Sequence, residues 1–516
     1  MAEPVRVKEV KQQAHIRLQA FHRARQAGRL ALEQVNEWAA DAATDLMACR
    51  PLVCAEALRL LCEIATLDDE TLAAPGLNAL FRDVVEPLSD SFEPSDCASY
   101  YAIFAHVIEF CRQLPQQQKL NRQLNQFGLQ STRDLNQRMQ TVRQIKPCDP
   151  ARTGRIKRAF ILSRVTLGAD VEITSIIWQK LRQLMPSAEI ILLGSEKANE
   201  LFGGSASLRI HRLDYHRGSS LLERLASWIA VVETIKELAT GLSHDEFLIV
   251  DPDSRLTQLG LLPLAQDERH SYFFESRSYQ KDGLSGLSQL AATWADETFG
   301  EGQRLYPCVW LRRDDVVFGK TVVERIRAKR PRDLITLSLG VGGNPRKCLN
   351  ESFELELVSR LLQTGAALVV DKGVGAQEVQ RVDSIIRAVC QQGRRVIELD
   401  ERNASARVAL DDLDADLFTW HGGIGRFSAL VAHSDQYIGY DSAGQHIAAA
   451  LGIPTTVIFA GYPSRRFVER WTPGGPAPVN ILCVESAWSV ASLVDDVLRA
   501  VDQMRVHRPR QTLVQL

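Results

Sequence analysis

The chain has 516 residues, of which 45% are hydrophobic and 24% are charged, and its net charge at pH 7 is −2. This composition is typical of soluble globular proteins. The length exceeds what one hydrophobic core usually organises, so we expect two or three domains. A net charge near zero provides no general attraction to nucleic acid, which we exclude as an expected partner.

Neither a secretory signal nor a membrane span is predicted. The first 20 residues alternate charged residues with alanine, without the apolar core of a signal peptide. No segment approaches the ~20 apolar residues that a membrane span needs. The ten cysteines form no CxxC pair, and Cys49 and Cys54 lack further Cys or His residues at zinc-ligand spacing. We therefore expect buried, reduced thiols in a cytoplasmic protein.

Residues 1–150 are predicted to form an all-helical N-terminal domain. Apolar residues recur at intervals of three and four in residues 24–48 and 54–67, and β-branched runs are few. Residues 146–154, KPCDPARTG, contain two prolines and a glycine, which marks a boundary. We expect an α/β region to begin at residue 151.

The rest of the chain alternates short buried strands with amphipathic helices, which predicts parallel sheets covered by helices. One series occupies residues 151–328 and a second occupies residues 329–516, whose last helix we expect to cross back onto the first series. The fold class expected is therefore α/β, with two Rossmann-like domains preceded by the helical one. Ligands of such sheets bind at the carboxyl ends of the strands. The strand segments, two of which run into a loop, are residues 158–165, 188–195, 245–255, 270–278, 334–344, 366–373, 394–399, 436–442 and 455–459.

Residues 441–459, DSAGQHIAAALGIPTTVIF, follow one strand, cross a short helix and enter the next strand. We expect Asp441 or Ser442 to cap the helix and Gly444 to let a ligand approach the backbone. The first-turn N–H groups and the positive end of the helix dipole would then form an anion site of the kind that binds phosphate.

This stretch and four other segments resemble glycosyltransferase family 9, the family of the ADP-heptose:lipopolysaccharide heptosyltransferases. The resemblance covers residues 155 to 505. Its most specific part is D-S-A-G-Q-H, followed by A-A-A-L-G-I-P-T-T-V-I-F and then by G-Y-P-S-R-R-F-V-E-R-W. The weaker segments are AFILSRVTLGAD with the helix and strand beyond it, DEFLIVDPDSRLTQLG, and LSLGVGGNPRKCLNESFELELVSRLL.

The resemblance implies a GT-B fold, in which two Rossmann-like domains face a cleft, and an inverting transfer that needs neither metal nor cofactor. The donor would be a nucleotide sugar, with ADP-heptose favoured, and the acceptor a surface glycan, a lipopolysaccharide-type lipid-linked glycan or a protein. Without a metal, protein charges and helix dipoles must stabilise the leaving diphosphate. The residues that match the family's donor site are Lys347, Arg346 and Gly343 at the phosphates, Ser442, Ala443 and Gly444 as backbone donors, Glu378 beside the ribose, Asp441 at the sugar hydroxyls, and His446 at the loop or the phosphate.

Asp170 matches the family's general base, which takes the proton of the acceptor hydroxyl. The family loop reads S-L-G-D, whereas this chain has T-L-G-A-D, and the inserted Ala169 makes Glu172 an alternative base. Three residues follow a strand on the acceptor side and are candidates for binding a polar acceptor. These are Asp251, Asp253 and Arg255.

Two other functions are open to this sequence. A catalytically silent relative could bind a partner through its helical N-terminal region, and an Asp170 carboxylate turned away from the cleft, or a filled cleft, would mark it. A dinucleotide-dependent oxidoreductase is disfavoured, because LGVGGNP is not a GxGxxG motif that enters a helix directly. Residues 1–150 could bind a protein partner, associate with a second copy or lie on the inner membrane surface.

Overall fold

The computed structural model describes residues 5–213, 215, 220–329, 332–342, 344–401, 413–485 and 488–505. Every described element before residue 158 is a helix. These elements are α1 (Val5–Gln26), α2 (Leu32–Ala48), α3 (Ala55–Ala65), α4 (Glu70–Asn78), η1 (Ala79–Val85), α5 (Glu86–Asp90), α6 (Pro94–Arg112), η2 (Pro115–Gln117), α7 (Gln118–Gln126), α8 (Thr132–Val142) and α9 (Pro150–Thr153).

Strands and helices alternate from residue 158 onward. The elements of the first series are β1 (Arg158–Leu162), α10 (Leu167–Ala169), η3 (Asp170–Thr174), α11 (Ser175–Leu184), β2 (Glu189–Gly194), α12 (Glu196–Phe202), β3 (Leu208–Arg212), α13 (Leu221–Leu238), η4 (His244–Glu246), β4 (Phe247–Asp251), η5 (Arg255–Thr257), η6 (Glu268–His270), β5 (Ser271–Phe273), α14 (Leu287–Phe299) and α15 (Arg313–Lys329).

The second series continues to the end of the described chain. Its elements are β6 (Leu334–Ser338), η7 (Pro345–Lys347), α16 (Glu351–Gln363), β7 (Ala367–Asp371), α17 (Ala376–Gln391), β8 (Val396–Asp400), β9 (Leu417–His421), α18 (Ile424–Ala432), β10 (Gln436–Tyr440), α19 (Ala443–Ala450), β11 (Thr455–Phe459), α20 (Arg465–Arg470), β12 (Val479–Cys483) and α21 (Val490–Met504).

The strands form one sheet of five and one of seven, and the strand pairs described are parallel. The expected α/β class, with two parallel sheets and their helices, is confirmed. The chain divides into two compact units. Unit 1 comprises residues 1–165 and 213–280, and unit 2 comprises residues 166–212 and 281–516.

The seven-stranded sheet lies wholly in unit 2, in the order β12-β11-β10-β6-β7-β9-β8. Its first strand in sequence, β6, therefore has β7 on one side and β10 on the other. The chain reverses its direction of winding at this point, and open parallel sheets bind ligands outside the carboxyl ends of the strands at such a switch point. The topology thus singles out the loops after β6 and β10.

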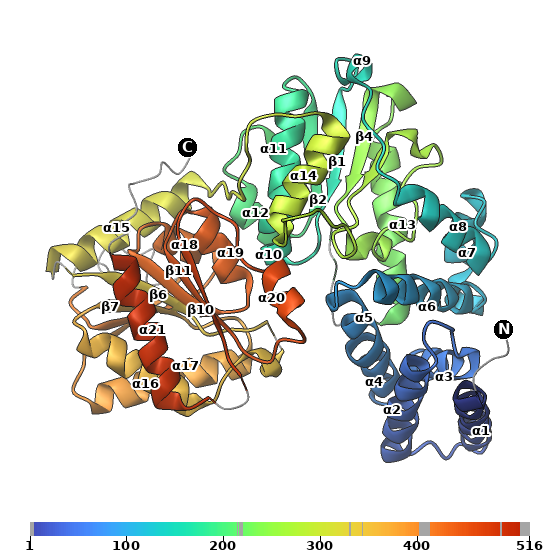
Figure 1. Cartoon of the computed structure of the whole chain (residues 1–516), viewed down its shortest axis with the longest axis horizontal. Helices are drawn as coiled ribbons and strands as arrows, with labels where there is room; N and C mark the ends of the chain where they lie inside the picture. The colour runs from blue at the N-terminus through green and yellow to red at the C-terminus, as the bar shows by residue number, and fades with distance from the viewer. Residues whose placement is uncertain are drawn as a thin grey trace. The chain divides into compact units, whose positions relative to one another are not determined.

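Helices cover both faces of the seven-stranded sheet (Figure 1). Helices α16, α17 and α21 place Leu357, Ile385 and Val497 in the core on one face. Helices α15 and α18 place Val322 and Leu430 in the core on the other face. Strands that are buried on both faces are near-continuous apolar runs, which explains why segments such as ALVVD could be recognised in the sequence.

Within unit 1, the N-terminal helices pack against the loop that follows β4. Arg138 of α8 donates a hydrogen bond to the carbonyl of Gly260 at 2.6 Å and forms an ion pair with Glu268. Tyr100 of α6 donates to the carbonyl of Gln258 at 3.3 Å. The helices before residue 150 thus share one compact unit with β1, β4 and β5, and their independence as a domain stays a prediction.

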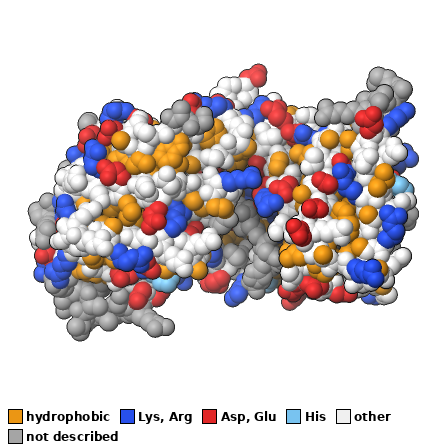
Figure 2. All heavy atoms as spheres, turned by 90° about the horizontal axis from the view of Figure 1, so that it is seen from below, with side chains coloured by type: hydrophobic (Ala, Val, Ile, Leu, Met, Phe, Trp, Pro, Cys, Tyr) orange, Lys and Arg blue, Asp and Glu red, His pale blue; other side chains and the backbone are white. Residues whose placement is uncertain are grey.

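Acidic and basic side chains are interspersed on the face drawn in Figure 2, as the small net charge leads one to expect. The ten cysteines are all free. Six are buried, but Cys390 is exposed and Cys308, Cys348 and Cys483 are partly exposed. The expectation that all thiols are buried was therefore wrong for these four. No helix within the described ranges is both long and apolar enough to cross a membrane.

Candidate functional site

The loops after β6 and β10 bring two sequence-predicted residues into contact at the switch point of the sheet. Lys347 ends the short helical turn η7 beyond β6, and Asp441 follows β10 directly. Lys347 Nζ donates to Asp441 Oδ2 at 2.5 Å. The Lys347 side chain keeps 27% of its surface exposed, against 8% for Asp441. A cation at this switch point therefore remains accessible to an anionic ligand. The Arg346 side chain is exposed on the same turn, and Gly343 lies outside the described residues.

The short helix α19 begins immediately beyond Asp441, but no side chain caps it as predicted. Ser442 has the extended backbone of an N-cap residue and its side chain makes no capping hydrogen bond. Asp441 instead accepts from Gln445 Nε2 at 2.9 Å with the carboxylate oxygen that does not face Lys347. Ala443 and Ser442 are partly exposed at the helix start. Capping by Ser442 or Asp441 was thus a wrong prediction, because the acid is recruited by Lys347 and Gln445.

Gly444 has a packing role that the sequence did not indicate, and its predicted role in ligand approach stays a prediction. A Cβ atom at this position would lie 2.1 Å from the hydroxyl oxygen of Tyr437, and one at Gly439 would lie 2.5 Å from it. Tyr437 is fully buried beneath α19. The glycine is therefore required for packing against an internal tyrosine, which the helix-mouth pattern could not reveal.

Glu378 organises the glycine-rich loop after β6. Its Oε1 accepts from the backbone N–H groups of Val341 at 3.0 Å and Gly342 at 3.2 Å, and its Oε2 accepts from Gly375 at 3.3 Å. A Cβ at Gly340 would come within 2.9 Å of the same carboxylate. Glu378 thus fixes the loop that carries the candidate phosphate residues, and its predicted contact with a ribose stays a prediction.

Sequence reasoning missed Asp371, which ends β7 beside the switch point. Burial raises the pKa of this carboxyl from 3.8 to about 6, against the lowering effect of hydrogen bonds from the Gly373 N–H and the Ser338 hydroxyl. Ser338 ends the adjacent strand β6 and lies 3.3 Å from Asp371 Oδ2. The available signal was position alone, since the acid is the last residue of an otherwise apolar strand.

The segment with the predicted base packs directly on α19. A Cβ at Gly168 would lie 2.7 Å from the His446 ring and 3.4 Å from the Cα of Ala443. Asp170 is only 1% exposed, and its Oδ1 accepts from the Thr174 hydroxyl at 2.8 Å. The loop with the inserted alanine therefore still reaches the first turn of the candidate donor helix.

Glu172, the alternative base, faces the interior of this packed region. Its Oε1 accepts from His446 Nδ1 and from the backbone N–H of Gly474, both at 2.9 Å. Glu172 is 1% exposed and His446 is 2% exposed. Trp471 packs edge-on against the His446 ring, with the centroids 5.7 Å apart. Glu172 thus binds the helix that follows Asp441, a contact that neither residue's local sequence indicated.

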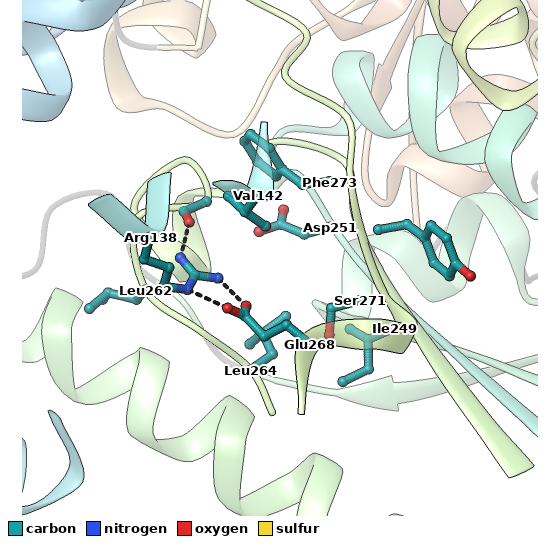
Figure 3. Close-up of a pocket in the computed structure, with 11 residues that line it drawn as sticks. Arg138, Val142, Ile249, Asp251, Leu262, Leu264, Glu268, Ser271 and Phe273 are labelled. Carbon is teal, nitrogen blue, oxygen red and sulfur yellow. Dashed lines mark hydrogen bonds and ion pairs between the residues drawn. The ribbon is translucent and has the colours of Figure 1, made fainter. Parts of the chain in front are cut away.

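Asp251, an acceptor-side candidate in unit 1, lines a narrow pocket beside the Arg138–Glu268 ion pair (Figure 3). Asp251 ends β4 and accepts from the Ser254 N–H at 2.7 Å and from the Thr257 hydroxyl at 2.5 Å. Burial raises the pKa of Asp251 from 3.8 to about 6, although these two hydrogen bonds lower it.

Asp253 and Arg255 differ in their accessibility. Asp253 has a left-handed backbone with φ 69°, which non-glycine residues rarely adopt. Its Oδ2 accepts from Ser276 at 2.7 Å and from Arg277 at 2.6 Å in the buried interior. Arg255 is partly exposed. Of the three acceptor-side candidates, Arg255 is the one that presents the most surface to solvent, and all three roles stay predictions.

The raised pKa of Asp251 leads to a pH-dependent stability. The Asp251 carboxyl binds its proton more tightly in the folded state than in the unfolded chain. The protonated carboxyl therefore contributes its full stabilisation to the folded state below pH 4, and this contribution is lost as the pH rises to about 6. The difference in the free energy of unfolding between wild type and Asp251→Asn should change by about 3 kcal/mol over this interval. Urea unfolding of both proteins from pH 4 to 7 measures it, and a constant difference would contradict the assignment.

No group of three or more His, Cys, Asp or Glu side chains that could hold a metal ion occurs within the described part of the chain. This finding describes the protein side chains alone. The metal and cofactor requirements of the site therefore stay predictions.

Solved structures that are similar to this chain include family 9 glycosyltransferases. One is the glycosyl transferase family 9 protein from Veillonella parvula DSM 2008, with 12% identity, a TM-score of 0.49 and coverage of 68% of this chain and 97% of that one. E. coli heptosyltransferase WaaC with ADP has 11% identity, a TM-score of 0.44 and coverage of 66% and 99%. E. coli ADP-heptose lipopolysaccharide heptosyltransferase II has 12% identity, a TM-score of 0.42 and coverage of 68% and 99%. No protein-family model and no curated protein matches the chain.

Proposed function

We propose that this chain is a glycosyltransferase that transfers a sugar from a nucleoside-diphosphate donor to an acceptor hydroxyl. The observation that carries the proposal is the Lys347–Asp441 pair at the switch point of the seven-stranded sheet. The same helix start contacts the segment that contains Asp170. A cation, a sugar-binding acid and a candidate base thus come from three separate stretches of sequence.

The proposed reaction is an inverting displacement. Lys347 and the first-turn N–H groups of α19 bind the diphosphate, and Asp441 accepts hydrogen bonds from the sugar hydroxyls. The acceptor oxygen bonds to the anomeric carbon while the bond from that carbon to the phosphate oxygen breaks. Asp170 takes the proton of the acceptor hydroxyl, and Lys347 balances the charge that develops on the leaving diphosphate.

The finer identity of the substrates belongs to the same proposal. The motif around Asp441 resembles that of the heptosyltransferases, and on this basis we propose ADP-heptose as the donor. A surface glycan, a lipopolysaccharide-type acceptor or a protein would supply the hydroxyl. We also propose that no metal takes part, with Lys347 and the helix start in its place.

Thermal-shift titration with ADP, UDP, GDP and ADP-heptose tests the donor site, because a ligand that binds only the folded state raises its apparent stability. Wild type should respond to ADP and ADP-heptose. Lys347→Ala should bind them roughly tenfold to a hundredfold more weakly, since a hydrogen bond to a charged group contributes about 1.5–3 kcal/mol.

Lys320→Ala is the matched control, because this lysine is exposed on α15 and forms an ion pair with Glu324 at 3.9 Å. Its titration should equal that of wild type. A thermal shift with UDP or GDP alone would still support a glycosyltransferase but would reject ADP-heptose as its donor. The absence of any nucleotide response would overturn the proposal and favour the silent, partner-binding alternative.

A further inference from the structure

A chain of buried hydrogen bonds connects Asp441 to Glu172. Gln445 Nε2 donates to Asp441 Oδ1 at 2.9 Å and lies 3.2 Å from His446 Nε2. His446 Nδ1 in turn lies 2.9 Å from Glu172 Oε1. Gln445, His446 and Glu172 are each at most 2% exposed. All four residues belong to unit 2, although Glu172 is far from the others in sequence.

The chemistry of the end groups fixes where the protons lie. Asp441 is paired with Lys347, so its carboxylate only accepts hydrogen bonds, and the amide NH₂ of Gln445 must face it. The same NH₂ group faces His446 Nε2, which must then accept. The remaining ring nitrogen, Nδ1, therefore carries the proton and donates it to Glu172. His446 is thus a neutral imidazole protonated on Nδ1.

Donor binding would change the partner of only one oxygen of Asp441. A diphosphate at the helix start competes with Asp441 Oδ2 for Lys347, whose Nζ is 2.5 Å away. The released Oδ2 becomes available to a sugar hydroxyl. Oδ1 remains bound to Gln445, and through His446 to Glu172, which is also held by the N–H of Gly474.

We propose that Gln445, His446 and Glu172 are positioning residues that keep Asp441 in one orientation when a donor phosphate takes Lys347 from it. This inference rests on the proposed function. Glu172 lies two residues beyond Asp170 in the same turn, η3. This chain of hydrogen bonds, here called the relay, therefore connects Asp441, the proposed sugar-binding acid, to the segment that carries the proposed base.

Calorimetric titration with two probes, ADP and ADP-heptose, separates positioning from a structural effect. Gln445→Met fills a similar volume but can neither donate to Asp441 nor contact His446 by hydrogen bonding. ADP-heptose should bind about tenfold more weakly to this variant, as expected for a lost hydrogen bond to a charged group. ADP, which lacks the sugar, should bind within twofold of wild type.

Three further variants complete the comparison. Glu172→Gln keeps an oxygen that accepts from His446 and Gly474, so it should bind ADP-heptose like wild type, whereas Glu172→Ala should resemble Gln445→Met. Gln436→Met is the matched control, because this buried glutamine donates to the Val501 carbonyl in the same unit. It should leave the ratio of the two affinities unchanged. The inference would be overturned if Gln445→Met bound ADP and ADP-heptose more weakly by the same factor, or if it bound both as wild type does.

The tautomer of His446 supplies a test that needs no ligand. The ¹⁵N resonances of the imidazole should show a proton on Nδ1 and an unprotonated Nε2 in wild type. Glu172→Ala should shift the population away from this tautomer. A proton on Nε2 in wild type would overturn the relay. Failure of wild type to bind either probe would instead overturn the proposed function, and with it the role of the relay at the sugar.

Discussion

The Asp170→Asn variant is expected to lose sugar transfer by about 10²- to 10⁴-fold, the usual contribution of a positioned general base. The amide cannot take the proton of the acceptor hydroxyl. It keeps an oxygen in the place of Oδ1, which accepts from Thr174 at 2.8 Å, so the fold should persist. Product formation from ADP-heptose under saturating donor measures the loss.

Nucleotide affinity distinguishes this loss from damage to the donor site. Asp170→Asn should bind ADP as wild type does, because the residues proposed to hold the diphosphate are Lys347 and the first turn of α19. Thr174→Val removes the same hydrogen bond without removing the carboxylate and should retain most of the transfer activity. Unchanged transfer by Asp170→Asn would reject Asp170 as the base.

The Glu354→Ala variant is expected to lose about 3 kcal/mol of unfolding free energy, because removal of one partner from a buried ion pair leaves the other charge uncompensated. Glu354 on α16 is fully buried and pairs with Arg381 of α17. It also accepts from the Tyr440 hydroxyl, at the end of β10, at 3.0 Å. The expected loss lies at the lower end of the range that is usual for breaking a buried ion pair. The reason is that the Arg381 side chain is 24% exposed, so water can solvate part of its charge. Urea unfolding measures the change.

A double substitution isolates the electrostatic part of this effect. Glu354→Leu combined with Arg381→Leu removes both charges and should cost much less than Glu354→Ala, since paired buried charges are often replaceable by apolar side chains. Tyr440→Phe removes only the hydroxyl and should cost about 1 kcal/mol. A double variant as unstable as Glu354→Ala would show that packing, rather than charge, explains the loss.

The alternation of strands and helices could be predicted from local patterns, and the candidate site was predicted from strand ends together with the family resemblance. Strands buried on both faces are continuous apolar runs, and the residues that follow them collect at one edge of a parallel sheet. The resemblance to family 9 implied that Lys347 and Asp441 belong to one donor site, and the structure brings Lys347 Nζ and Asp441 Oδ2 to 2.5 Å. Their mutual pairing was not predicted, because the sequence does not specify which acid a lysine will meet.

The remaining contacts join residues of different elements. Gly444 of α19 packs against Tyr437 of β10, and the pattern of the helix start does not indicate this contact. Glu172 is an alternative base in the sequence because of the inserted Ala169. Its contacts with His446 and Gly474, which follow it by about three hundred residues, could not be predicted from its neighbours. Periodicity reports which face of an element is buried, but not which side chain of another element covers it.

The division of the chain into its two compact units has a consequence for biosynthesis. The backbone passes from one unit to the other after residues 165, 212 and 280, so no single proteolytic cut or truncation separates them. Unit 1 has all its residues once residue 280 has been translated. Helix α11, in the earlier part of unit 2, packs against α14, which lies beyond residue 280. During translation, the segment that includes Asp170 and Glu172 therefore lacks this partner until the chain beyond residue 280 has been made.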